Sequence, residues 1–534
     1  MPFVWGLYEG DSETYLEFES TEELLKFLED KNWTVYAHNG GRFDYHYLRH
    51  AMNADDPVMV INGRMAKFKI GECEFRDSAN LMPAALAEIG NKREIDYALM
   101  EPDRRTDPNV RAEISKYLRA DCVELWLALE RYFSEFGQGL TQAGSAMKYW
   151  SRTSGIDIPR QTAQLHDRYR PYYYGGRVEC FTSGYRKKDF KVIDINSAYP
   201  KAMTHAHIFS SEARINDHLP SDELIERCLI RLRCVSTGAF PFRTSEQKLI
   251  FPDDETVREY TITGWEFIAA LEFNAIHDIS IIEVHQFDEV MDFESYVMQF
   301  YEARKKAKSI GDKAGDLFAK IYMNALYGKF GASPSHLVEG AEERYHNYRE
   351  YVIATTDSVQ KWATEGYRHH IQPGYVGSDA WGERILMERP LPEEKEKFYN
   401  VATAASITGW VRAYMFRSLN QCGGRLYCDT DSIAAEDVSM LPLGSDLGQW
   451  KQEMQCDEYA ICGKKLYAFH NAIGPYDDKK NPEWKIACKG VDFDAQQIKR
   501  IASGETILYV PDAPTYSISR ATPRFIQRRV AMTA

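Results

Sequence analysis

The alternation of apolar and polar residues divides the front of the chain into short strands and longer helices. Apolar-rich runs at residues 3–9, 14–18 and 33–39 predict strands. The stretches 21–30 and 117–133 carry the apolar spacing of amphipathic helices. Strands and helices in this alternating order predict an α/β unit with a central sheet.

The pattern changes after this front unit. Residues 190–300 hold several strand candidates, among them "CLIRLRC" at 228–234. Residues 296–330 predict two helices, which the glycines of "SIGDKAGD" separate. Residues 333–400 are polar, aromatic and broken by glycine and proline, so we interpret them as an insertion on a core that resumes at 399–416. The fold class expected is therefore α/β and α+β, in several domains.

Composition limits the class of protein. The 534 residues are 44% hydrophobic and 13% aromatic, which is ordinary for a globular protein and enough for several domains. No run approaches the roughly 18 apolar residues of a membrane helix, and the N-terminus lacks the pattern of a secretory signal. The 10 cysteines form no CxxC pair, so we expect reduced thiols, a cytoplasmic location and no membrane association.

The formal charge of −14 argues against a general nucleic-acid coat, but the basic residues are bunched. The clearest clusters lie at 168–177, 185–188, 304–308 and 520–529. A protein of this kind can hold a phosphate backbone in one groove. A solvated surface is the alternative interpretation of each cluster.

Asp194 ends an apolar run that begins with Val192 and Ile193 and predicts a buried strand. A buried charge is costly unless it is paired or binds a metal. Asp429 and Asp431 stand two residues apart between two strand-like runs, and in a β-hairpin this spacing would place both on one face. An aspartate-rich surface turn is the alternative, and the presence of Asp194 makes a shared site the stronger hypothesis.

Three carboxylates close together repel one another unless divalent cations neutralise them. Oxygen ligands of this kind suit Mg²⁺, with Mn²⁺ as an alternative. Two such ions predict phosphoryl transfer, in which one ion activates the attacking hydroxyl and the other steadies the leaving pyrophosphate.

A third element supplies what this reaction also needs. Lys320, Asn324 and Tyr327 lie at spacings that share one face of a helix. A lysine there can meet triphosphate oxygens, and an aromatic ring one turn on can pack against a base.

The motifs "DINSAYP", "KIYMNALYGKFG" and "YCDTDS" resemble motifs A, B and C of the family B DNA polymerases, in the family order. The resemblance is to the protein-primed branch of phages, adenoviruses and linear plasmids. The segments "YYYGGR", "TGWVR" and "KKLY" are similar to its YxGG, template-contact and KxY motifs. The resemblance implies that Asp194 and Asp431 hold two catalytic metal ions and that Asp429 assists.

Further roles follow from the resemblance alone. The nucleotide-binding residues it implies are Tyr199, Lys308, Lys320 and Tyr327. The DNA-binding residues it implies are Asn324, Gly328, Tyr172, Gly175, Gly176, Thr408, Arg412, Lys465 and Tyr467.

The front unit resembles the proofreading exonuclease of these enzymes. The matching exonuclease-like residues are Asn39, Phe43, Asp44, Ser78, Tyr117 and Asp121. In the family, an Asp-x-Glu motif lies on a strand before the one that matches "VWGLYEG", and no such strand precedes it here. Asp11 and Glu13 have the right letters, but their place predicts a turn. We therefore expect a retained exonuclease fold with absent or very weak activity; a start codon further upstream is the alternative.

The resemblance implies an RNase H-like exonuclease domain followed by a right-hand polymerase with two insertions. The ranges expected are 1–135 for the exonuclease-like domain, 136–205 and 396–497 for the palm, 206–295 for a terminal-protein insertion, 296–331 for the fingers, 332–395 for a strand-displacement insertion, and 498–534 for the thumb.

The predicted function is template-directed addition of deoxynucleotides to a 3′ end, by two-metal phosphoryl transfer and with strand displacement. The expected partners are primer-template DNA and dNTPs. A terminal protein that supplies the priming hydroxyl in place of a DNA primer is a further candidate partner. The chain is expected to act as a monomer. The alternative is a catalytically inactive, polymerase-like DNA-binding replication factor. A nuclease built on the front unit alone is disfavoured by the missing Asp-x-Glu.

Overall fold

The computed structural model describes residues 2–90, 95–337, 343–370, 384–473 and 483–510, together with the backbone of 515–517, 520–524 and 528–531. Parts of the predicted second insertion and of the predicted thumb lie outside the described residues.

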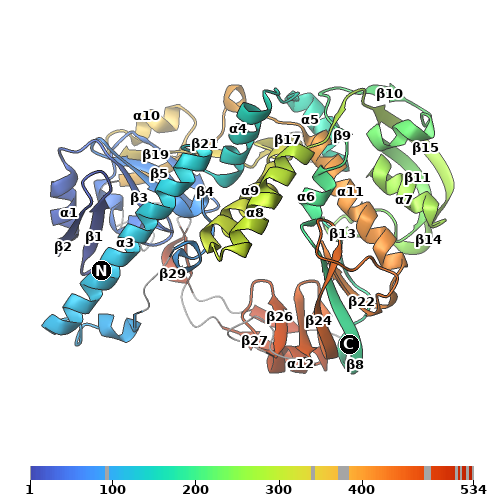
Figure 1. The fold of residues 1–534 in the computed structure, drawn as a ribbon. Coiled ribbons are helices and arrows are strands. Elements are labelled where there is room, and N and C mark those ends of the chain that lie inside the picture. The colour runs from blue at the N-terminus through green and yellow to red at the C-terminus, as the bar shows by residue number, and fades with distance from the viewer. Residues whose placement is uncertain are drawn as a thin grey trace.

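The front unit alternates strands and helices, which confirms the α/β prediction (Figure 1). Its main elements are β1 (Trp5–Glu9), β2 (Thr14–Phe18), α1 (Thr21–Leu28), β3 (Thr34–Ala37), β4 (Pro57–Ile61), β5 (Arg64–Ile70), β6 (Cys73–Asp77) and α3 (Pro108–Phe136). Strands β1 and β2 form an antiparallel hairpin, and residues 10–13 make the turn between them. The predicted turn at Asp11 and Glu13 is therefore confirmed.

One seven-stranded sheet joins the front unit to the second insertion. Its strand order is β20-β21-β19-β4-β5-β6-β3. The insertion contributes β19 (Arg349–Thr355), β20 (Arg368–His369) and β21 (Arg384–Pro390). Strand β19 pairs with β4 through Tyr351 and Val58, so segments almost 300 residues apart complete a single sheet. Figure 1 shows the insertion beside the blue N-terminal strands.

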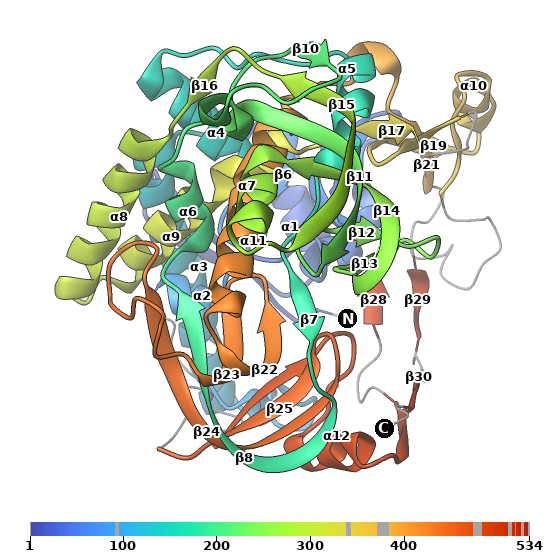
Figure 2. The ribbon, with the colours of Figure 1, turned by 90° about the vertical axis from the view of Figure 1, so that its right-hand side faces the viewer.

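A second seven-stranded sheet forms the base of the other half, with the order β26-β25-β24-β8-β23-β22-β7. Its strands are β7 (Val178–Cys180), β8 (Gly184–Ile195), β22 (Gly423–Asp429), β23 (Ser432–Asp437), β24 (Trp450–Gly463), β25 (Leu466–Asn471) and β26 (Trp484–Cys488). Helices α6 (Ala198–Met203) and α11 (Val401–Asn420) lie above it in Figure 2. Helix α11 is buried on nearly all sides, because it is apolar around most of its circumference.

The first insertion is a four-stranded sheet of order β10-β15-β11-β14, covered by α7 (Gly264–Glu272). The predicted strand at 228–234 lies within β11 (Cys228–Thr237) and is confirmed; the other strands are β10 (Arg214–Asn216), β14 (Asp253–Thr263) and β15 (Ile276–Gln286). Gly409 of α11 allows close packing here, because a Cβ at this position would lie 2.2 Å from the Thr263 hydroxyl.

Helices α8 (Glu294–Ser309) and α9 (Lys313–Phe330) confirm the predicted helix pair. Arg304 of α8 donates to Asp316 of α9 at 2.8 Å. Arg131 of α3 forms an ion pair with Asp312, the N-cap of α9, at 2.6 Å. These contacts fix the helix pair to the long helix of the front unit.

All 10 cysteines are free thiols, as the sequence predicts. Among the described residues, no helix combines the length and apolar character needed to cross a bilayer.

Candidate active site

Asp194 and Asp431 lie side by side in the palm sheet. Asp194 is the penultimate residue of β8, opposite Ser432 at the start of β23. The Ile195 amide donates to the Asp431 carbonyl at 2.8 Å, so the backbone itself holds the two residues together. Both side chains are mostly buried. The predicted convergence of these two distant carboxylates is present in the structure.

The environment of this pair disfavours two negative charges. Burial raises the pKa of Asp194 to about 7, and the charge of Asp431 adds to the effect. Burial likewise raises the pKa of Asp431 to about 6, with Asp429 as the next cause. Glu453 of β24 raises both pKa values further and was not predicted from the sequence. A strand residue 22 positions after Asp431 gives no sequence signal that it will face this pair.

Asp429 is paired with a lysine, whereas the sequence predicts that it joins Asp194 and Asp431. The Lys465 ammonium donates to both carboxylate oxygens of Asp429, at 2.7 and 2.8 Å. Thr430, between the two aspartates, has a φ of +62°, and this left-handed residue interrupts strand alternation. The spacing of two therefore does not by itself place Asp429 and Asp431 on one face, and the structure ties Asp429 to a lysine.

The donor set fits a divalent cation through Asp194 and Asp431. Two buried carboxylates with raised pKa values are the arrangement that a hard cation would neutralise. Within the described ranges, no group of three or more His, Cys, Asp or Glu side chains is arranged to hold a metal ion. Asp429 would have to exchange Lys465 for the cation to complete such a group.

Two tyrosines from motifs A and B stack beside the pair. Tyr199, near the start of α6, and Tyr327, near the end of α9, have ring centroids 4.2 Å apart and an interplanar angle of 4°. Burial raises the pKa of Tyr199 to about 12, so its hydroxyl stays protonated. The charge of Asp431 reaches both hydroxyls and raises both pKa values.

Helix α9 presents the remaining motif B residues on its open side. Lys320 and Gly328 are exposed, and the Asn324 amide donates to the Lys320 carbonyl at 2.8 Å. Lys308 is exposed at the end of α8. Among the described residues, neither lysine makes an ion pair, so both ammonium groups are available to an anionic ligand.

The loop at 170–177 supports the aspartate turn. Gly176 packs against Thr430, where a Cβ would lie 2.7 Å from the threonine methyl. The Arg177 carbonyl accepts the Thr430 amide at 2.7 Å. Gly175 is exposed, and its predicted DNA contact stays a prediction. This loop therefore sets the geometry of the turn that carries Asp429 and Asp431.

Arg412 and Thr408 are buried in this structure, and the DNA contact predicted for them stays a prediction. Both side chains are 2% exposed. The Arg412 guanidinium pairs with Glu266 at 2.7 and 3.1 Å and donates to the Tyr174 carbonyl at 2.8 Å. Glu266 in turn accepts the Thr263 amide at 3.0 Å. Arg412 thus connects α11, α7 and the 170–177 loop.

Two predicted DNA-contacting tyrosines are also buried. Tyr172 is 2% exposed, and its ring packs edge-on against His285. Tyr467 is 7% exposed and stacks on Phe469 with centroids 4.3 Å apart. Both rings pack in the protein core, where they stabilise the fold beneath the site.

Only some of the exonuclease-like residues lie close to one another. Asp44 lies in an exposed 3₁₀ turn, and Phe43 beside it is 59% exposed. Tyr117 and Asp121 lie one turn apart on α3, and the Tyr97 hydroxyl lies 3.2 Å from that of Tyr117. Burial raises the pKa of the Cys122 thiol to about 12, and the charges of Asp121 and Asp44 contribute, so both carboxylates lie near this thiol.

Ser78 is fully buried in this structure, and its predicted contact with single-stranded DNA stays a prediction. Its hydroxyl donates to the Ala37 carbonyl at 3.2 Å. The neighbouring Asp77 was missed by the sequence analysis, and its carboxylate accepts the Asn39 and Gly41 amides at 2.9 and 3.2 Å. Asp77 therefore shapes the 38–44 loop, in which Asn39 has a left-handed φ of +63°.

Comparison with known proteins agrees with this geometry. A family model described as DNA polymerase type B, organellar and viral, matches residues 92–362. The DNA-directed DNA polymerase of Enterobacteria phage PRD1 is 32% identical over 559 aligned positions, covering 100% of this chain and 95% of that protein. The chain belongs to the type B DNA polymerases. It is a DNA-directed DNA polymerase.

Other similarities are more distant. A probable DNA polymerase of Agaricus bitorquis is 22% identical over 82% of this chain and 64% of its own length. Phi29 DNA polymerase, solved with primer-template DNA and incoming nucleotide, superposes with a TM-score of 0.74 at 16% identity over 99% of this chain and 96% of that one. The predicted fold class, with exonuclease-like and polymerase parts, is thereby confirmed.

Proposed function

We propose that this polymerase extends a primer on a DNA template through two divalent cations, Mg²⁺ first among them, held by Asp194 and Asp431. The observation that carries the proposal is the buried, adjacent pair with raised pKa values. When bound, the cations supply charge neutralisation at the attacking and leaving oxygens. The pair itself must lose its protons before it can bind them.

The stacked tyrosines and the exposed lysines would form the nucleotide site. The faces of Tyr199 and Tyr327 offer a flat apolar surface next to the carboxylates, which suits the sugar and base of an incoming dNTP. Lys308 and Lys320 would meet the triphosphate as point charges. Asn324 and Gly328 would lie along the template beside them, and Gly176 would keep the aspartate turn in place.

An Asp431→Asn variant tests this assignment. Nucleotide incorporation on a primed template should fall by at least about 1,000-fold, because a neutral amide cannot hold the cation, while DNA affinity should stay within about twofold. Asp437→Asn is the matched control, since Asp437 is an exposed aspartate at the other end of the same strand. Loss of DNA binding in Asp431→Asn, or retained incorporation, would contradict the proposal.

We also propose strand displacement and a choice of priming hydroxyl, both resting on the resemblance. Strands β19, β20 and β21 of this insertion join the sheet of the front unit, so the insertion has a rigid base from which to act on DNA. Extension around a primed circle without a helicase should give products longer than unit length. Initiation on an unprimed template, with and without a candidate terminal protein, tests protein priming. Cytoplasmic location and the monomeric state stay predictions.

A further inference from the structure

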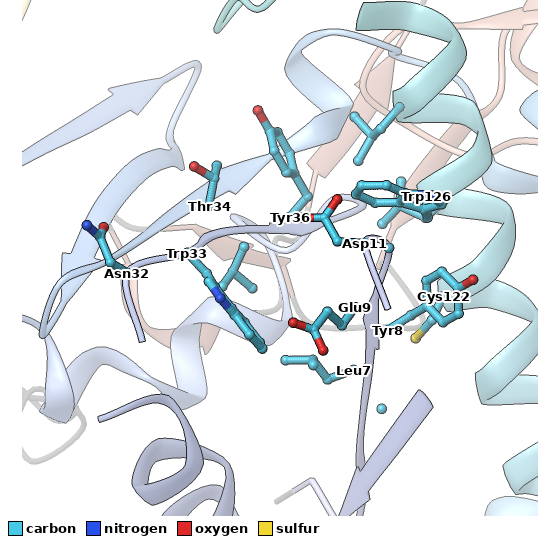
Figure 3. A pocket seen from close by; sticks show the side chains of 15 residues that line it. Leu7, Tyr8, Glu9, Asp11, Asn32, Trp33, Thr34, Tyr36, Cys122 and Trp126 are labelled. Carbon is cyan, nitrogen blue, oxygen red and sulfur yellow. The ribbon is translucent and has the colours of Figure 1, made fainter. Parts of the chain in front are cut away.

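Helix α3 packs against two different parts of the molecule. Its middle faces the strands of the front unit, where Cys122 and Trp126 line a cavity of about 320 Å³ beside β1 and β3 (Figure 3). Nearer its C-terminal end, the Phe133 ring packs on the Tyr36 ring of β3, with centroids 5.6 Å apart. The side chains around Phe133 turn to the helix pair α8 and α9 instead. The last turns of α3 therefore connect the front unit with the fingers.

An aromatic contact forms the buried part of this connection. The Tyr322 hydroxyl of α9 donates to the Tyr132 hydroxyl of α3 at 2.7 Å. The Phe136 ring stacks on the Tyr322 ring, with centroids 3.5 Å apart and an interplanar angle of 15°. Both tyrosines are fully buried. Because a close-packed interior does not absorb a shift of one helix, this contact fixes where the middle of α9 lies relative to α3.

A bidentate ion pair forms the outer part of the connection. The Arg131 guanidinium donates to both carboxylate oxygens of Asp312, at 2.9 and 2.6 Å. Asp312 is the N-cap of α9 and also accepts the Gly315 amide at 2.9 Å. The Arg131 hydrogen bonds hold the pKa of Asp312 well below its ordinary value, so the carboxylate stays ionised. Two parallel hydrogen bonds fix direction as well as distance, and they do so at the first turn of α9.

Side-chain packing does not support the helix pair at this point. A cavity of about 460 Å³ adjoins the ion pair. Its lining includes Arg131 and Glu135 of α3, Lys306 and Ala307 of α8, and Asp312. Because this space is unfilled, the ion pair rather than packing holds the start of α9 against α3.

The residues of the proposed nucleotide site lie on either side of the ion pair. Lys308 precedes Asp312 by four residues, and Lys320 follows it by eight. Successive helix residues turn by about 100°, so Lys320 and Tyr322 lie on opposite sides of α9. Accordingly, Lys320 is exposed, and Tyr322 is buried against α3. A shift of the α3 side of this helix therefore moves Lys320 and Tyr327 relative to the palm aspartates.

We propose that Arg131 is a positioning residue for nucleotide binding: by holding Asp312, it keeps the lysines of α8 and α9 where they meet the triphosphate of an incoming dNTP. This inference rests on the nucleotide site proposed above. It gives the front unit a part in polymerisation that is independent of exonuclease activity.

Single-nucleotide incorporation by the full chain on a primed template tests the proposal. Arg131→Met and Asp312→Asn should each raise the KM for dNTP about fivefold to tenfold, while kcat and the Kd for primer-template DNA stay within about twofold. Asparagine is itself a good N-cap, so Asp312→Asn removes the charge pair and keeps the cap of α9. The double variant should be no worse than either single variant, because both changes remove the same interaction.

Further variants separate the possible causes. Arg131→Lys keeps the charge but not the bidentate geometry, so the KM should rise only about twofold to threefold. Arg119→Met is the matched control, since Arg119 is exposed on the same helix beside the Tyr15 ring, and it should leave the KM unchanged. Lys320→Met tests the nucleotide site separately, because it should raise the KM even if Arg131 has no part in binding.

Thermal denaturation verifies folding. Both side chains of the ion pair are partly exposed, so each change should leave the midpoint within about 2 °C of that of the unmodified chain. If Arg131→Met fails to fold, Arg131→Lys and Asp312→Asn carry the test. The proposal is overturned by an unchanged or lower KM in these variants, by a fall in kcat as large as the rise in KM, by additive effects in the double variant, or by an equal effect of Arg119→Met.

Discussion

The palm and the front unit both contain aspartates that belong to recognisable motifs, but the two regions position these aspartates in different ways. In the palm, the Ile195–Asp431 backbone hydrogen bond brings two carboxylates together and burial raises both pKa values. In the front unit, burial also raises the pKa of Asp44, and the charge of Asp77 adds to the effect. Among the described residues, neither region holds a group of three or more side chains arranged to bind a metal ion. Matching motif letters do not by themselves make a site, because a metal site also requires ligands that converge.

The difference has a structural cause. The palm aspartates lie on neighbouring strands of one sheet, whose hydrogen bonds fix their separation. The front aspartates lie on a short 3₁₀ turn and on α3, where no sheet hydrogen bonds fix their separation. The front unit pairs with the fingers through Arg131 and Asp312 and shares a sheet with the second insertion, and its absent or very weak exonuclease activity stays a prediction.

The largest expected effect separates the two regions directly. On a 3′-mismatched primer with Mg²⁺, excision should be at least about 1,000-fold slower than incorporation, because we expect the front unit to lack the Asp-x-Glu pair of a two-metal exonuclease site. Gel analysis of the end-labelled primer measures both rates. As a control, Asp44→Ala and Asp121→Ala should leave incorporation unchanged. Excision at a rate close to incorporation, abolished by either change, would contradict this view of the front unit.

The next effect tests Arg412 as a positioning residue. Arg412→Ala should lower the free energy of unfolding by about 3 kcal/mol, because it leaves the Glu266 carboxylate buried without its partner. Incorporation should fall with it, since the 170–177 loop loses an anchor. Arg412→Met combined with Glu266→Leu should recover much of the stability, as measured by thermal denaturation.

The salt dependence of DNA binding distinguishes positioning from phosphate contact. A buried Arg412 releases no counterion, so the slope of log affinity against log salt should be the same in Arg412→Ala and the unmodified chain. A slope that is smaller by about one unit in Arg412→Ala would instead indicate that Arg412 contacts a phosphate of the DNA, as the sequence predicts.

A smaller effect follows from the raised pKa of Asp194. The folded chain binds the Asp194 proton more tightly than the unfolded chain does. The contribution of this carboxyl to the free energy of unfolding is therefore greatest below about pH 4 and is lost as the pH rises to about 7. Asp194→Asn should therefore raise the midpoint of thermal unfolding by a few degrees at pH 7.5 in the presence of EDTA, and not at pH 4.

Added Mg²⁺ should reverse the order of the two proteins at pH 7.5, because the ion stabilises only the chain that binds it. Asp437→Asn, on the exposed end of β23, serves as the control and should show no such gain. If Asp194→Asn raised the midpoint of thermal unfolding equally at both pH values, the cause would be packing rather than the charge of Asp194.

The smallest effect concerns the Lys465–Asp429 pair. Lys465→Met should tighten Mn²⁺ binding in the absence of DNA by about threefold, because the lysine no longer competes for the Asp429 carboxylate. Electron paramagnetic resonance of free Mn²⁺ measures this. Lys464→Met is the neighbouring control, since Lys464 donates to the Leu249 carbonyl. Weaker binding in Lys465→Met would indicate that the lysine positions Asp429 for the metal.

Much of the fold was predictable because it depends on local patterns. The helix pair at 296–330, the strand at 228–234 and the turn at Asp11 and Glu13 follow from apolar spacing and from glycine. The pairing of β19 with β4 was not predictable, because nothing in either strand specifies a partner almost 300 residues away. The burial of Arg412 was missed for the same reason, since its partner Glu266 lies in another segment.

The sequence alone determined which residues could take part in the chemistry: the three aspartates, together with Lys320 and Tyr327 on one helix, while the family resemblance added Tyr199 and Lys308. It did so because side-chain chemistry and short spacings are properties of the chain itself. Only the tertiary structure decided which of them meet. Asp194 joins Asp431, Lys465 joins Asp429, and the rings of Tyr199 and Tyr327 stack, because these contacts depend on strand register and burial that only the folded chain fixes.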